Sequence, residues 1–293
     1  MKNMMWRAAL ISGVALVAGP AVAEHPWNNY HWKKGSGELT VPVGDNVSAQ
    51  WDDYLQRAMN GGPRVSGGTG EGWNASSVIN SAIVAGSTNP RTCKARAGTI
   101  QVCNSRYGNN GWLGIAQIWL SGGHIVQGVT KLNDTYFDTN TYNKPEWRML
   151  VTCQEIGHDY GLGHTDETFN NANDGTCMDY TSAPAGGVVG GFNYGPSNEY
   201  INQHDKDQLA NIYNHSEPTQ TNFAIREFGK APVQDGFSDN DIGGDGPPAW
   251  GSPISRDSMG RPDVFVADLG NGKKRVTHVF WAMGEGPRGG HHE

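Results

Sequence analysis

Charge is scarce in this sequence, and the features of several large protein classes are missing. Only 17% of the 293 residues are charged, and Asp and Glu outnumber Lys and Arg by 29 to 22. The resulting net charge of −7 argues against a surface built for nucleic acid or anionic membranes. Past the first 23 residues, no apolar run approaches the about 20 residues that span a membrane. We therefore expect no nucleic-acid partner and no stable membrane insertion of the mature chain.

Glycine and large aromatic residues are abundant instead. The 41 glycines are about twice the usual share of roughly 7%, and they accompany 10 Trp and 10 Tyr. This composition favours a loop-rich globular fold held by large aromatic side chains, and it argues against long helical bundles. With 37% hydrophobic residues, the chain is also too apolar for wholesale disorder.

Residues 1–23 have the pattern of a signal peptide. Lys2 and Arg7 flank the start of a short apolar stretch, and small residues at 21–23 form a cleavage site. We expect the mature chain to begin at Glu24, so the net charge of −7 becomes −9 when Lys2 and Arg7 are removed. An uncleaved anchor is the alternative. The pattern predicts a secreted or periplasmic protein, which we expect to be a monomer.

The four cysteines all lie in the predicted mature chain: Cys93, Cys103, Cys153 and Cys177. An even number in an exported protein indicates disulfides, although the sequence leaves three pairings open. A bridge between Cys93 and Cys103 would close a short hairpin, and each bridge contributes roughly 2 to 4 kcal/mol. A four-cysteine zinc site is the weaker alternative, because no Cys-x-x-Cys spacing is present.

Local patterns predict one mixed sheet with flanking helices. Alternating or apolar runs predict strands at residues 38–43, 76–85, 99–103, 114–120 and 124–132. Helical spacing predicts helices at residues 48–59, 143–161 and 205–213. The middle helix is the best defined, with Asn143 as its cap, Pro145 in its first turn and Gly161 at its end. We expect these elements to form a first domain, residues 24–215.

The C-terminal part has a different composition. Residues 216–253 are rich in Gly, Asp and Pro and predict a linker, whereas residues 254–293 predict a β-hairpin extension around Gly270-Asn271-Gly272. Carboxylates in this region are weak candidates for calcium, because their spacing lacks the glutamate of an EF-hand loop. They are Asp235, Asp239, Asp241 and Asp245.

The residues that carry chemistry lie at the end of the middle helix. Residues 154–164 read Gln-Glu-Ile-Gly-His-Asp-Tyr-Gly-Leu-Gly-His. Gln154 and His158 are four apart and share one helix face, and a turn at Gly161 brings His164 back towards them. Two imidazoles and one further ligand leave an open zinc position for a water molecule, whose proton Glu155 can accept.

This stretch resembles the long zinc signature of the metzincin metallopeptidases, His-Glu-x-x-His-x-x-Gly-x-x-His. Residues 177–180, Cys-Met-Asp-Tyr, resemble the Met-turn of that family. The resemblance covers about residues 27–215. It implies an α+β catalytic domain with a mixed, mostly parallel twisted sheet, an active-site helix and a C-terminal helix.

The resemblance also implies a role for each matched residue. His158 and His164 match zinc ligands, and Glu155 matches the catalytic base. The remaining matches are a turn residue, the hydrophobic floor below the metal and a tyrosine that ligates zinc or stabilises the oxyanion: Gly161, Met178 and Tyr180. A disulfide from Cys153 to Cys177 would tie the active-site helix to the Met-turn.

Gln154 departs from the family pattern, because it stands where the first zinc-binding His is expected. An amide oxygen is a poorer donor to Zn²⁺ than an imidazole nitrogen. Three outcomes are open: Gln154 ligates through its oxygen, Tyr180 or a distant His completes the site, or the metal is weak or absent.

Other histidines are weaker candidates for metal ligands. His124 lies in a predicted hairpin, His278 in the final hairpin, and His291 and His292 at the C-terminal tail. A lone strand histidine such as His124 is more often a surface residue. His278, His291 and His292 could bind metal loosely, although we expect the tail to be solvated.

The predicted function is a secreted zinc metalloendopeptidase that acts on protein or peptide substrates. Zn²⁺ would polarise the scissile carbonyl, Glu155 would deliver the water, and the substrate backbone would lie along the hairpin edge strand. The alternative is an inactive secreted binding module that keeps the metallopeptidase scaffold.

Overall fold

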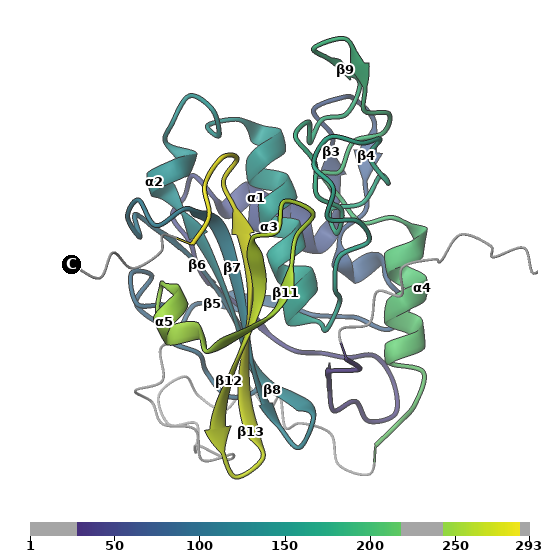
Figure 1. Ribbon diagram of the computed structural model, residues 1–293. Coiled ribbons are helices and arrows are strands. Elements are labelled where there is room, and N and C mark those ends of the chain that lie inside the picture. The colour runs from purple at the N-terminus through teal and green to yellow at the C-terminus, as the bar shows by residue number, and fades with distance from the viewer. Residues whose placement is uncertain (1–27, 218–242, 288–293) are drawn as a thin grey trace, which may run out of the picture.

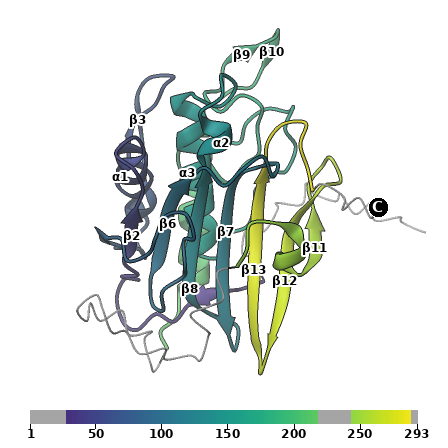
Figure 2. The same cartoon turned by 90° about the vertical axis from the view of Figure 1, so that its left-hand side faces the viewer.

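The computed structural model describes residues 28–217 and 243–287 and shows an α+β fold around one large mixed sheet (Figures 1 and 2). The sheet order is β11-β12-β13-β7-β8-β6-β2-β5, and β1 pairs with β8. Its strands are β1 (His31–Trp32), β2 (Val43–Asn46), β5 (Ile83–Ala85), β6 (Ile100–Ser105), β7 (Trp112–Ser121), β8 (His124–Asn133), β11 (Ser252–Arg256), β12 (Pro262–Gly270) and β13 (Lys273–Trp281).

The remaining elements are helices and two small ribbons. The helices are α1 (Asp52–Asn60), the 3-10 turn Trp73–Ala75, α2 (Asp134–Phe137), α3 (Pro145–Asp159), α4 (Gln203–Ile212) and α5 (Pro247–Trp250). The ribbons pair β3 (Gly62–Pro63) with β4 (Thr69–Gly70), and β9 (Val188–Val189) with β10 (Phe192–Asn193). In the part of the chain that the structure describes, no helix is both long enough and apolar enough to span a membrane.

The sheet corrects the prediction of mostly parallel strands. The pairings of β8 with β6, β6 with β2 and β2 with β5 are parallel, but β11, β12, β13, β7 and β8 pair antiparallel and contribute most of the paired residues. The physical reason is the C-terminal hairpin, whose tight turn at Asn271 imposes antiparallel pairing. The predicted hairpin is therefore present, and it extends the main sheet.

Strand β13 also changes the position of β7. It pairs with β7 along its whole length, from Lys273 opposite Ser121 to Trp281 opposite Trp112. Since β8 pairs with the other side of β7, β7 lies inside the sheet. The β7–β8 hairpin, predicted to offer an edge strand to the substrate backbone, therefore has no edge strand in this structure. The place where a substrate binds stays a prediction.

Helix α3 is enclosed by the fold and ends where the sequence predicts. All residues from Trp147 to Asp159 are buried, since the helix lies between the sheet and α1. Gly161 follows with φ of 95°, and a Cβ there would come within 2.1 Å of the Tyr30 carbonyl oxygen. At the other end the cap is Lys144; the predicted cap, Asn143, instead accepts a hydrogen bond from Arg148.

Two apolar clusters cover the two faces of the sheet. Val276 and Phe280 of β13 belong to the main core with α3, whereas Val279 and Trp281 pack with Trp250 of α5. Figure 1 shows α5 and α3 on opposite sides of the sheet. Alternate residues of β13 therefore point towards different layers.

Buried tryptophans fix the position of α3, as the aromatic-rich composition predicts. The indole of Trp32 donates a hydrogen bond of 2.8 Å to the carbonyl of Asp159, and the indole of Trp73 donates one of 3.1 Å to Cys153. Trp73 also lies so close to Gly157 that a Cβ there would come within 2.6 Å of its ring. These contacts hold both the middle and the end of the helix.

Both favoured disulfides are confirmed. Cys93 bonds to Cys103, and Cys153 of α3 bonds to Cys177, directly before Met178. The second bridge joins α3, which carries His158, to the segment that contains Met178.

Some predictions fall on residues outside the described ranges. They include the signal peptide at 1–23, most of the linker, three of the proposed calcium-binding carboxylates and the tail histidines: Asp235, Asp239, Asp241, His291 and His292. The remaining carboxylate, Asp245, forms an ion pair of 2.8 Å with Lys131.

Candidate metal centre

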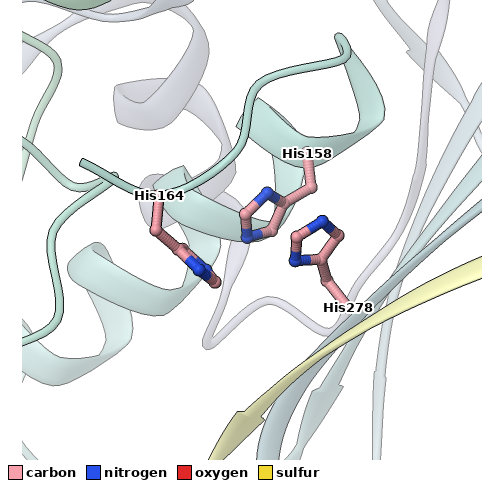
Figure 3. Close-up of side chains that lie close together, drawn as sticks. All are labelled: His158, His164 and His278. Atoms are coloured by element: carbon pink, nitrogen blue, oxygen red, sulfur yellow. The ribbon is translucent and has the colours of Figure 1, made fainter. Parts of the chain in front are cut away.

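Three histidine side chains converge between α3 and the sheet. His158 comes from the last turn of α3, His164 from the following loop and His278 from β13 (Figure 3). One nitrogen from each ring lies within 4.8 Å of the others. The rings of His158 and His278 are stacked with centroids 3.7 Å apart, and His164 stands almost perpendicular to both.

The turn after α3 orients the first two rings. Because the chain reverses at Gly161, the Leu162 carbonyl accepts a 2.8 Å hydrogen bond from Nδ1 of His158. That bond places the proton on Nδ1, so Nε2 is the ring nitrogen that can bind a metal. The loop beyond His164 is held by the amide of Thr165, which donates to the carbonyl of Met178.

His278 reaches the centre because β13 pairs with β7. It stands opposite Ala116 and shares its strand face with Val276 and Phe280, which belong to the core around α3. The sequence does not place His278 beside His158 and His164, because no local pattern reports which distant strand β13 joins. The available indication was a single imidazole on an otherwise apolar strand face.

Gln154 takes part in a structural contact. Its Nε2 donates a 2.8 Å hydrogen bond to the carbonyl of Cys177, beside the disulfide that joins the same two segments. Its Oε1 is buried and has no hydrogen-bond partner within the described ranges. The third imidazole beside His158 and His164 is that of His278. A ligand role for Gln154 stays a prediction.

Glu155 is fully buried against β7. A Cβ on Gly114 would come within 2.6 Å of its Oε1, so the absence of a side chain at that position makes room for the carboxyl group. Burial and the neighbouring Asp159 raise the pKa of Glu155 well above its usual range, and the backbone of Ala116 offsets this in part. Since Ala116 pairs with His278, Glu155 and His278 lie against the same stretch of β7.

Burial keeps two of the imidazoles neutral. It lowers the pKa of His164 to about 3, and it lowers the pKa of His278 well below its usual range together with repulsion from the other two rings. Neutral imidazole is the form that binds metals. His164 and His278 therefore need not lose a proton to bind a metal at neutral pH.

Met178 and Tyr180 lie next to the histidines as the Met-turn resemblance implies. A Cβ on Gly157 would come within 2.5 Å of the Met178 sulfur, so Met178 packs directly against the helix beside His158. The Tyr180 ring lies 4.3 Å from the His164 ring and stacks on Phe169. Burial raises the pKa of Tyr180 well above its usual range, so its hydroxyl stays protonated.

A cluster of acidic side chains that the sequence did not predict lies next to His164. Glu167 Oε1 lies 3.1 Å from His164 Nδ1, and Asp263 of β12 is buried nearby. Burial raises the pKa of both carboxyls to about 7. Repulsion from Asp257 adds to both shifts, and a hydrogen bond with Asp263 offsets part of the shift of Glu167. Asp257 is itself paired with Arg261 at 2.6 Å. No sequence motif joins these residues, because the β11–β12 turn brings them together.

The centre is closed in this structure. His158 is 1% exposed and His278 is 2% exposed, and the side chain of His164 is 2% exposed. β13 covers one side, and the β11–β12 turn reaches the loop beyond His164, where the Ser258 hydroxyl donates to the carbonyl of Glu167. The C-terminal extension thus supplies one imidazole and part of the cover.

The fold and the site together define an α+β protein with a buried three-histidine centre on an enclosed helix. The sequence matches no protein-family model, and comparison with curated proteins gives no significant match. A functional assignment therefore depends on the chemistry of the centre itself.

Proposed function

We propose that the protein is an exported zinc-dependent peptidase whose metal is held by His158, His164 and His278. The observation that carries the proposal is the convergence of three imidazoles whose donor nitrogens lie within 4.8 Å of one another. Three nitrogen donors suit Zn²⁺ and leave a fourth position for water, whose pKa a bound zinc ion lowers towards 7. The two disulfides support an oxidising location outside the cytoplasm.

Glu155 is the general base in this proposal. Its buried carboxyl lies against Gly114 of β7, two residues from Ala116, which pairs with His278. A nearby cation favours the ionised carboxylate and so opposes the effect of burial on the pKa of Glu155. Glu155 then accepts the proton of the attacking water and passes it to the leaving amine. Tyr180, which stays protonated, can donate a hydrogen bond to the developing oxyanion.

The closed centre limits how a peptide can bind. Because β13 occupies the side of β7 that a peptide strand would use, substrate must enter by another route or after the C-terminal strands move. The same observation favours a second candidate function, an inactive binding module in which the metal only stabilises the fold. Four-coordinate closed zinc sites are typically structural, so a buried centre is compatible with that candidate.

Substituting Glu155 separates the two functions. We expect Glu155→Gln to keep zinc binding and to lose peptide hydrolysis by 10² to 10⁴-fold, the usual contribution of a general base. Glu146→Gln, at the start of the same helix, is the matched control and should retain full activity. Hydrolysis of a broad peptide library, followed by mass spectrometry, measures both. A zinc-loaded wild-type protein without hydrolytic activity supports the binding module, and unchanged activity of Glu155→Gln contradicts the mechanism.

A further inference from the structure

A second group of metal-binding side chains lies apart from the three-histidine centre and shares none of its residues. His31, His124 and Glu217 place one donor atom each within 4.8 Å of the others. His215 joins them, with its Nε2 3.3 Å from Nε2 of His31. We propose that these four side chains bind a divalent transition-metal ion of the zinc type.

The fold brings the four side chains together from three distant segments. The parallel pairing of β1 with β8 places His31 directly opposite His124. The chain beyond α4 is fixed beside β1, because the amide of Glu217 donates a 2.9 Å hydrogen bond to the carbonyl of Lys34. Tyr213 anchors the same segment by accepting a hydrogen bond from the amide of Trp32. The backbone therefore positions the cluster independently of its side chains.

The ring orientation of His31 suits a metal ligand. Its Nδ1 donates a 2.6 Å hydrogen bond to the carbonyl of Asn29, so its Nε2 presents a free electron pair to the cluster. The 3.3 Å between this atom and Nε2 of His215 matches the separation of about 3.3 Å between two ligands at 2.0–2.1 Å in a tetrahedral zinc site.

Glu217 supplies the oxygen donor. Its Oε1 lies 2.6 Å from Nε2 of His124 and 3.8 Å from Nε2 of His31. Its Oε2 is buried and has no hydrogen-bond partner within the described ranges. Glu217, with one unsatisfied oxygen, lies beside His31 and His124, and His215 lies beside His31, so the proposed donor set is three nitrogens and one oxygen. This set favours zinc and similar ions over calcium or magnesium, which prefer oxygen ligands.

The site has features of a structural metal site. All four ligands come from the protein, which is the typical arrangement for tetrahedral structural zinc. The side chains of His31 and Glu217 are each 17% exposed, so an ion can reach them from solvent. Bound metal would join β1 to the chain that leaves α4.

Zinc counting on single-site variants tests the proposal. After equilibrium dialysis against Zn²⁺, elemental analysis should find one ion fewer per chain in His215→Ala than in the wild type. His215 is exposed, so this variant should fold normally. His204→Ala on α4 is the matched control and should leave the count unchanged. The count should fall similarly in His124→Ala, and zinc should raise its melting temperature less than that of the wild type.

A wild-type zinc count in both His215→Ala and His124→Ala would overturn the proposal. The count in His278→Ala reports separately on the three-histidine centre, since the two sites share no ligand. Failure of one site is therefore distinguishable from failure of the other.

Discussion

At the residue scale, the central observation is that the imidazole of His278 in β13 lies beside His158 and His164, the two histidines of the motif at residues 154–164. Gln154, which stands in the expected ligand position, instead donates a hydrogen bond to Cys177. The proposed ligand set is thus divided between the motif and His278, which lies 114 residues beyond His164. A motif search that ends at His164 misses this part of the centre.

Removing the imidazole of His278 should lower the affinity of the centre for zinc. We expect His278→Ala to lower zinc affinity by at least 10-fold, because only two imidazoles remain. His278→Gln offers an oxygen donor of similar reach and should restore little of the affinity. Competition with a zinc-binding dye measures the change, and His204→Ala serves as a control on α4. Equal affinities of His278→Ala and the wild type would remove His278 from the ligand set.

The buried carboxyls near His164 make a pH-dependent prediction. The pKa of Asp263 is raised to about 7 from its usual value near 3.8, so the folded state binds its proton more tightly than the unfolded state. Stability from this group is therefore greatest at low pH and is lost as pH rises from about 4 to 7.

Asp263→Asn should remove this loss of stability. In metal-free protein, we expect the variant to exceed the wild type by about 1 to 3 kcal/mol at pH 8 and by much less at pH 5. Urea denaturation in the presence of a chelator measures the difference. Asp268→Asn, at the exposed end of the same strand, is the control. A stability difference between Asp263→Asn and wild type that is the same at both pH values would exclude ionisation of Asp263 as its cause.

At the scale of secondary structure, local sequence signals identify several elements that position the site. Pro145 and Gly161 correctly bracket α3, and Gly270-Asn271-Gly272 correctly locates the β12–β13 hairpin. Short strands are less predictable: the expected strand at residues 76–85 is reduced to β5, Ile83–Ala85. Short edge segments carry too few alternating residues for their periodicity to be distinctive.

The pairing of β13 with β7 could not be predicted from the sequence. Alternation in β13 shows that it is a strand, but the same pattern suits any neighbouring strand of similar length. The position of His278 depends on this register, which places it opposite Ala116. The candidate site was therefore predictable at His158, His164 and Glu155, whereas His278, Glu167 and Asp263 required the tertiary structure.

Hydrogen exchange tests this register directly. Because β7 pairs with both β8 and β13, its backbone amides should exchange slowly along the whole strand. A free edge strand would leave alternate amides open to water and rapid exchange. Slow exchange of β7 residues opposite Val276 and His278 would support the pairing, and rapid exchange at alternate positions would contradict it.

At the scale of the whole molecule, the C-terminal strands belong to the same structural unit as the zinc-like motif. The hairpin extends the sheet, contributes to both apolar clusters and supplies His278 and Asp263. The hairpin that the sequence predicts as a C-terminal extension thus pairs directly with the main sheet. Cys153–Cys177 fixes α3 to the Met178 segment, so the centre is assembled from three structural contributions: α3 with its turn, the Met178 segment and β13.

An anomalous-scattering map at the zinc absorption edge, from crystals of the zinc-loaded protein, tests the central claim most directly. If His158, His164 and His278 bind zinc, the map should show a peak about 2.0 to 2.1 Å from one nitrogen of each ring. Density at that position bound to Gln154 and not to His278 would contradict the ligand assignment. Absence of any peak between α3 and β13 would contradict the metal centre itself.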